Sequence, residues 1–209
     1  MTTLASAPSA LPPAAAAGSS AEVVIADVKR WLERAVIGLN LCPFAKAVYV
    51  KGQIHFAVSG ADTWQGLLDD LETEANQLLA LDSKARDTTL LIVPWCLQEF
   101  LEFSQFLRQA QRLLARRGLD AELQIASFHP RYQFADAAED DIGNFTNRAP
   151  YPVLHLLREA SVATATLAFA DAEAIYGANL RTLAALGREG WDALEIGATL
   201  DAPENARDR

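Results

Sequence analysis

The sequence predicts an α/β (or α+β) fold: a small domain of two or three layers around a mixed or parallel sheet of three to four strands. Residues 88–93 (TTLLIV) form a continuous apolar run that ends at Pro94, typical of a strand covered on both faces. Apolar residues then recur at helical spacing over residues 100–114, and residues 123–127 alternate between apolar and polar. These three segments predict one βαβ unit with parallel strands.

Two more helices and one more strand precede this unit. Apolar residues recur at three and four positions from Glu22 to about Leu39, which predicts an amphipathic helix. Residues 53–58 form a short, partly β-branched run between glycines, which predicts a strand whose direction the sequence leaves open. Asp62 is the expected N-cap of the next helix, because Gln65 completes a capping box.

The last third of the chain is expected to be helical. Pro152 suits the first turn of a helix that runs to about Ser161. Asp171 is the expected cap of a further helix that extends through Leu183 and that Gly187 interrupts. These segments predict additional C-terminal helices beside the sheet.

Length and composition favour one globular domain, residues 21–197. The chain has 209 residues, of which 51% are hydrophobic and 22% charged, enough to bury a sizeable core. Residues 1–20 are rich in Ala and Pro and are expected to be a disordered tail. Residues 198–209 are expected to be a polar tail, of which DAPENARDR, residues 201–209, should fray. No internal repeat is evident.

Charge and cysteine content restrict the classes of partner and compartment. A formal net charge of −9 argues against nucleic acid, because such affinity depends on Lys and Arg neutralising phosphates. No apolar run is long enough to span a membrane. Two cysteines and an N-terminus without a basic region fit a soluble protein of the reducing cytoplasm. The oligomeric state is unknown from the sequence.

The segment from Phe128 to Glu159 contains most of the candidate functional residues. His129 follows a predicted strand and His155 lies on the predicted helix after Pro152. An unperturbed histidine pKa near 6.5 makes both candidates for catalytic acid and base groups at neutral pH. The alternative is that both are structural.

Several neighbours could bind a small anion, a carboxylate or a phosphate. Asn147 and Arg148 come just before the predicted helix start, where unpaired N–H groups attract anions. Arg158 could grip the same ligand bidentately, and Tyr132 or Tyr151 could orient it.

The two thiols, Cys42 and Cys96, are weaker candidates. Cys96 precedes a predicted helix start, where the helix dipole lowers a thiol pKa, whereas Cys42 follows a helix end, where it raises it. The close ligand pairs typical of zinc sites are absent from the sequence, so no metal ligands are assigned and any cofactor is unknown.

Three segments resemble the hallmark segments of an uncharacterised bacterial family described only as a domain of unknown function. They are GLNLCPFA around Cys42, FHPRYQF around His129 and NFTNRAPYPVLHLLRE around His155. The resemblance spans roughly residues 22–183 and implies that Cys42, not Cys96, is the candidate functional thiol. It implies no reaction.

Three functions follow from these patterns. The first is an enzyme of small anionic substrates in which His129 and His155 act as acid and base and Arg148 binds the anion. The second is a ligand-binding or interaction domain without chemistry, in which the polar segment is a structural network. The third is a metal-dependent enzyme that uses both histidines. The first requires that His129, Arg148 and His155 meet in one cavity.

Overall fold

The computed structural model of the protein describes residues 14–168 and 172–200, and it is an α/β structure, as predicted. Its elements are, in order, α1 (Ala14–Trp31), the π-helical η1 (Leu32–Ile37), α2 (Ala45–Val50), β1 (Ile54–Val58), α3 (Trp64–Ala80), β2 (Thr88–Ile92), α4 (Phe100–Arg117), β3 (Leu123–Phe128), the 3-10 helix η2 (Ile142–Asn147), β4 (Val153–Arg158), α5 (Glu159–Ala168) and α6 (Ala172–Asp192).

The four described strands form one mixed sheet in the order β1-β2-β4-β3. β1 and β2 are parallel, which settles the direction that the sequence left open. β4 is antiparallel to both of its neighbours, so β2 and β3 point the same way. The predicted βαβ unit therefore has parallel strands, but β4 lies between them.

The prediction of a helix after Pro152 is wrong for residues 153–158, which form the strand β4. Leucines at 154, 156 and 157 fit both the periodicity of a helix and that of a strand. The strand is favoured because these residues pair with β2 on one side and with β3 on the other. Pro152 tolerates this position because a proline at the start of a strand loses no ladder hydrogen bond. The helix begins only at Glu159.

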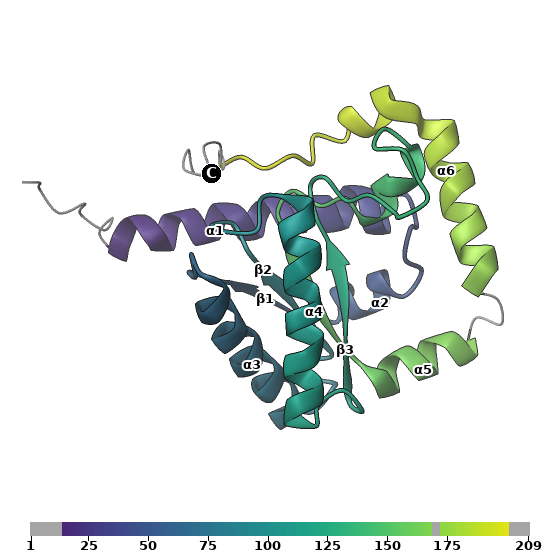
Figure 1. The fold of residues 1–209 in the computed structure, drawn as a ribbon. Helices are drawn as coiled ribbons and strands as arrows, with labels where there is room; N and C mark the ends of the chain where they lie inside the picture. Colours follow the sequence, from purple (N-terminus) through teal and green to yellow (C-terminus); the bar gives the residue numbers. More distant parts are fainter. Residues whose placement is uncertain (1–13, 169–171, 201–209) are drawn as a thin grey trace, which may run out of the picture.

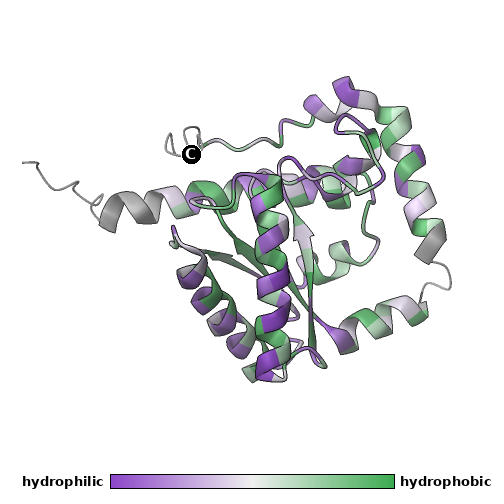
Figure 2. Ribbon diagram, in the orientation of Figure 1, coloured by the Kyte–Doolittle hydropathy of each residue, from purple (hydrophilic) through white to green (hydrophobic). Residues whose placement is uncertain are grey.

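Each face of the sheet packs against its own set of helices. Leu91, Leu154 and Leu156 point towards α3 and α4, whereas Leu90, Ile92 and Val153 point towards α1, η1 and α6. In Figure 1, α3 and α4 cover one side of the sheet and α1 crosses the other. Figure 2 shows β1 and β2 mostly in green, the upper part of β3 paler, and the outer face of α4 mostly in purple, as expected for a three-layer arrangement.

Two helix caps show how local sequence sets the element ends. Thr63, and not the expected Asp62, caps α3, because its side chain accepts the N–H of Gly66. α4 ends at Gly118, as its last-turn arginines predict, and Gly118 has φ of 69°, a left-handed conformation that favours glycine.

The described chain extends into both of the predicted tails. α1 begins at Ala14, inside the segment expected to be disordered, because alanine is the strongest helix former. Thr199 and Leu200, at the start of the predicted polar tail, donate backbone hydrogen bonds to Asp27 and Tyr151. The part of this tail that is expected to fray, residues 201–209, lies outside the described residues, as do residues 1–13 and Asp171, the expected cap of α6. No described helix is long and apolar enough to cross a membrane.

Candidate functional site

His129 is buried beneath α4, and both of its ring nitrogens are hydrogen-bonded to backbone. Nε2 lies 3.0 Å from the carbonyl oxygen of Leu97, and Nδ1 accepts the N–H of Arg131 at 3.0 Å. Nε2 therefore carries the proton. The ring is 0% exposed and packs against Phe100 and Phe103, and burial lowers its pKa to about 4. These contacts support a structural role as a neutral histidine.

His155 lies on the opposite face of the sheet, in the middle of β4. Its Nε2 is 2.6 Å from the hydroxyl of Thr88, and that hydroxyl donates its single proton to the carbonyl of Leu156. Nε2 must therefore be the N–H donor to Thr88, which leaves Nδ1 as an acceptor. Burial lowers the pKa of His155 to about 4, so the ring is neutral at neutral pH.

His155 forms part of the floor of a cavity of about 360 Å³, which we call the sheet-face cavity. The sheet contributes Thr88, Leu90, Ala126, Phe128 and His155, and α1, η1, α2 and α5 surround them. The lining is largely apolar, with Trp31, Val36 and Phe44 among its residues. Although the ring lies deep in the protein, part of its surface remains open to this cavity.

The polar segment between β3 and β4 is held by a network of side-chain to backbone hydrogen bonds. Asn144 is fully buried, accepts the N–H of Phe134 and donates to the carbonyls of Ala138 and Glu139. Asn147 donates to the carbonyl of Ser127. A long irregular segment needs such partners for its buried backbone groups, so both amides stabilise the loop.

Tyr132 and Arg148 belong to the same segment. The Tyr132 ring packs against Phe100 and Phe134, and burial raises the pKa of its hydroxyl. The Arg148 guanidinium donates to the carbonyls of Tyr132 and Glu139 and lies 4.2 Å from the centroid of the Phe145 ring. It lines a second cavity, separate from the one that His155 lines.

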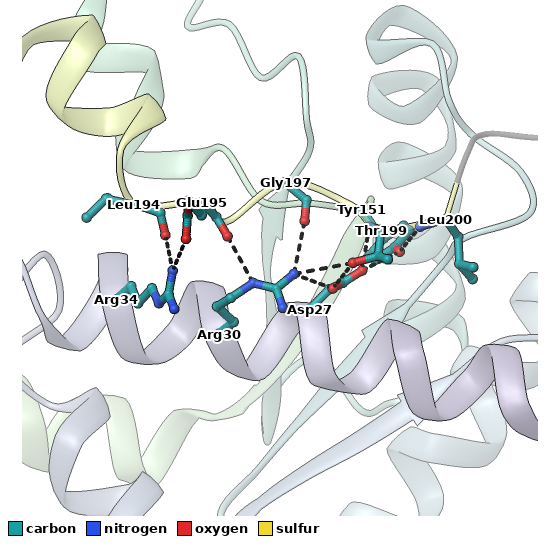
Figure 3. Close-up of polar contacts among 9 residues, drawn as sticks. All are labelled: Asp27, Arg30, Arg34, Tyr151, Leu194, Glu195, Gly197, Thr199 and Leu200. Atoms are coloured by element: carbon teal, nitrogen blue, oxygen red, sulfur yellow. Dashed lines mark hydrogen bonds and ion pairs between the residues drawn. The ribbon is translucent and has the colours of Figure 1, made fainter.

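Tyr151 lies at the centre of a contact between α1 and the C-terminal segment. Its hydroxyl donates to Oδ2 of Asp27 at 2.8 Å, and the backbone N–H and hydroxyl of Thr199 donate to the same carboxylate at 2.7 and 2.6 Å (Figure 3). Arg30 also pairs with Asp27. Burial would raise the pKa of Asp27, but the hydrogen bonds from Thr199, Tyr151 and Arg30 outweigh it and lower the pKa. Burial and Asp27 raise the pKa of Tyr151 to about 12.

Arg158 lies on the α3 side of β4, opposite to His155, because side chains alternate along a strand. Its Nη2 donates to the carbonyls of Leu78 and Leu81 at the end of α3, and to the carbonyl of Arg86 in the segment before β2. Arg158 therefore caps a helix C-terminus, where carbonyls lack helical partners.

The two thiols have different surroundings. Burial, with Glu102, Asp62 and Asp70 nearby, raises the pKa of Cys96 to about 11, so the prediction that the helix dipole activates this thiol is wrong. Cys42 lines the sheet-face cavity with His155. The structure thus brings Cys42 and His155 into one space.

The shared cavity expected for His129, Arg148 and His155 is not formed. His129 is sealed, whereas Arg148 lines one cavity and His155 another, and the two cavities share no lining residue. The two histidines face opposite sides of the sheet, so they cannot ligate one metal ion. Among residues 14–168 and 172–200, no group of three or more His, Cys, Asp or Glu side chains could hold a metal.

Sequence reasoning missed three residues that contact or neighbour the predicted site residues: Thr88, Asp27 and Arg188. Thr88 sets the tautomer of His155, Asp27 anchors the C-terminal segment, and Arg188 lines the same cavity as Arg148. Asp27 had a detectable signal, because an acid on the apolar stripe of an amphipathic helix needs a partner.

Comparisons with known proteins place the chain in a family without assigning it an activity. A search of curated proteins and a search of solved structures each found no match. A family model described as "Protein of unknown function (DUF1415)" matches residues 23–193. This range includes β1 to β4, Cys42 and the whole sheet-face cavity, and it includes the cavity that Arg148 lines except for residues 196–198. The chain therefore belongs to the DUF1415 family.

Proposed function

We propose that the protein binds a small, largely apolar ligand in the sheet-face cavity, and that His155 hydrogen-bonds the ligand's one polar group. The observation that carries this proposal is the state of His155. Its Nε2–H is committed to Thr88, and no described residue hydrogen-bonds to Nδ1, which the cavity reaches. A neutral imidazole then offers one acceptor at the base of an apolar space.

The size and lining of the cavity support such a ligand. Its volume of about 360 Å³ is more than twice the roughly 150 Å³ of an apolar cavity that holds benzene. Ligand sites are commonly apolar with a few polar groups that fix orientation. Besides His155 and Thr88, the polar lining includes Asp87 and Ser161, which hydrogen-bond to each other at 2.6 Å.

The polar group of the ligand should be a neutral donor, such as a hydroxyl or an amide N–H. An anion would meet an imidazole that stays neutral until its pKa of about 4 and would lose its hydration in an apolar space. The same low pKa makes His155 a weak base at neutral pH, which favours binding without proton transfer. This is the second of the three functions predicted from the sequence.

The test compares 4-butylphenol with butylbenzene, which differ by one hydroxyl. We expect the phenol to bind more tightly, and His155→Phe to weaken phenol binding about three- to tenfold, the value of one hydrogen bond, without weakening butylbenzene. His55→Gln is the matched control, because His55 is on β1 and its side chain faces the side of the sheet opposite to His155. Isothermal titration calorimetry gives the affinities, and amide chemical shifts in β4 and α2 locate the ligand.

Two results would contradict the proposal. One is that neither compound binds the wild-type protein at millimolar concentration. The other is that His155→Phe and His55→Gln weaken the phenol equally, since His155 would then have no special role.

A further inference from the structure

The cavity that Arg148 lines lies on another part of the surface, between η2 and the last turns of α6. Its volume is about 310 Å³, and its lining includes Phe145, Arg148, Arg188, Trp191, Asp192 and Ile196. We call it the arginine cavity. Residues 196–198 of the C-terminal segment form one wall, so three stretches of chain far apart in sequence build it.

Phe145 holds both arginines in this cavity. The Arg148 guanidinium carbon lies 4.2 Å from the centroid of the Phe145 ring, and that of Arg188 lies 5.3 Å from the same centroid. Trp191 packs edge-on against the ring, with centroids 5.0 Å apart. Cation–π contacts of this kind hold two like charges near each other in a fixed arrangement.

A break in α6 directs Arg188 to this place. Gly187 has φ of 65° and ψ of −178°, so the helix changes direction immediately before Arg188. That backbone region is accessible essentially only to glycine. The kink brings Arg188, Trp191 and Asp192 against η2.

The hydrogen bonds of the two arginines leave donors free for a ligand. Arg148 uses Nε and Nη2 on the neutral carbonyls of Tyr132 and Glu139, and no carboxylate in the described chain pairs with it. Arg188 uses Nε on both carboxylate oxygens of Asp192, at 3.1 and 3.2 Å. In the part of the chain that the structure describes, no residue accepts a hydrogen bond from Nη1 of Arg148 or from either Nη group of Arg188.

We propose that Arg148 and Arg188 form a binding site for a small oxyanion, a carboxylate or a phosphate group. Two guanidinium groups and one carboxylate give this cavity a net positive charge on a chain of formal charge −9. Guanidinium groups bind oxyanions through paired N–H donors. The site is separate from the sheet-face cavity, so its existence does not depend on the ligand proposed there.

The electrostatics of Arg148 are consistent with an anion in this position. Burial, and then the charge of Arg188, lower the pKa of Arg148, so its cationic form is held at a cost that an anion would offset. Asp192 competes for Arg188, and its removal should therefore strengthen anion binding.

The experiment titrates inorganic phosphate and, separately, succinate into the protein at neutral pH and low ionic strength, where charges are least screened. Arginine Nε–Hε resonances and backbone amide chemical shifts report binding. The anion that binds with the higher affinity shows whether the site prefers a phosphate or a carboxylate group. We expect Arg188→Gln to weaken binding about tenfold, the effect of losing a charge-assisted hydrogen bond, and Asp192→Asn to strengthen it a few-fold.

Arg112→Gln is the matched control, because Arg112 is an exposed arginine of α4 with no described partner. It changes the net charge as Arg188→Gln does, and it should leave both affinities unchanged. Arg188 is exposed whereas Arg148 is only partly exposed, so replacing Arg188 should not affect folding. The melting temperature without ligand checks this. The proposal is overturned if neither anion gives saturable shifts, if Arg112→Gln weakens binding as much as Arg188→Gln, or if Asp192→Asn has no effect.

Discussion

The Nε2–H of His129 donates to the carbonyl oxygen of Leu97 at 3.0 Å, and Leu97 has φ of 60°. A leucine in this left-handed conformation is uncommon and strained, and it persists only where surrounding contacts hold it. His129 supplies one such contact from a segment 32 residues away along the chain. The His129 imidazole therefore connects the loop between β2 and α4 to the loop that follows β3.

Replacing His129 with alanine should destabilise the protein by about 2 to 4 kcal/mol, because it opens a cavity and leaves buried backbone groups unpaired. Urea denaturation measures the change. His55→Ala is the control, since the His55 side chain is 44% exposed and should cost little. Equal effects of the two replacements would argue against this role of His129.

Acid should destabilise the protein between about pH 6.5 and pH 4. His129 and His155 both have folded-state pKa values of about 4, below the ordinary value of 6.5. The unfolded chain therefore takes up protons first, so the stabilisation is complete above pH 6.5 and is lost as pH falls towards 4.

From pH 7 to pH 5 this loss should amount to about 2 kcal/mol for each histidine. Urea denaturation at both values measures it in the wild-type protein and in His155→Phe, which should lose about 2 kcal/mol less over the same interval. An identical pH dependence in the two proteins would show that His155 does not carry a depressed pKa.

Asp27→Asn should release the C-terminal segment from α1. The Asp27 carboxylate accepts the N–H of Thr199 and the hydroxyl of Tyr151, and it pairs with Arg30, so an amide cannot satisfy all these donors. We expect the Thr199 amide to exchange its hydrogen faster, measured by hydrogen exchange. Glu195→Gln is the control, because its side chain is 79% exposed and its pairing with Arg34 is at the surface.

Gly187→Ala should destabilise the protein by about 1 to 3 kcal/mol, since an alanine cannot adopt its backbone angles without strain. Nothing lies within 4 Å of a Cβ added at Gly187, so the effect should come from the backbone and not from a clash. Gly60→Ala, in a loop with equally open space and no positive φ, should change the melting temperature little. If both variants melt alike, the kink before Arg188 does not require glycine.

Cys42 and Cys96 should differ in their reaction with iodoacetamide. Cys96 should react slowly at neutral pH, because its pKa is raised to about 11 and little thiolate is present. Cys42 lines the sheet-face cavity, so saturating 4-butylphenol should slow its labelling and leave Cys96 unaffected. Mass spectrometry of the labelled peptides distinguishes the two thiols, and unprotected Cys42 would place the ligand elsewhere.

The sequence predicted the elements whose own residues decide their structure. The run at 88–92 is buried throughout and central, as its continuous apolar character indicates. Arg116, Arg117 and Gly118 end α4 where such residues usually end a helix. The strand at 54–58 likewise follows from its flanking residues. In each case local propensity and tertiary packing agree.

The strand β4 and both cavities could not be predicted in this way. The residues from 153 to 158 become a strand because β2 and β3 pair with them on either side, and that pairing is not encoded in their own periodicity. His155 and Cys42 share a cavity only because elements 113 residues apart in the sequence close around it. Arg188 joins Arg148 through a kink that a single glycine permits.

The position of β4 also affects how the chain is made. Its two sheet neighbours, β2 and β3, are complete by residue 128, but the strand that joins them ends only at residue 158. During translation the nascent chain therefore exposes two hydrophobic strands with open edges until the ribosome has released β4. A pause in synthesis between β3 and β4 would prolong that exposure.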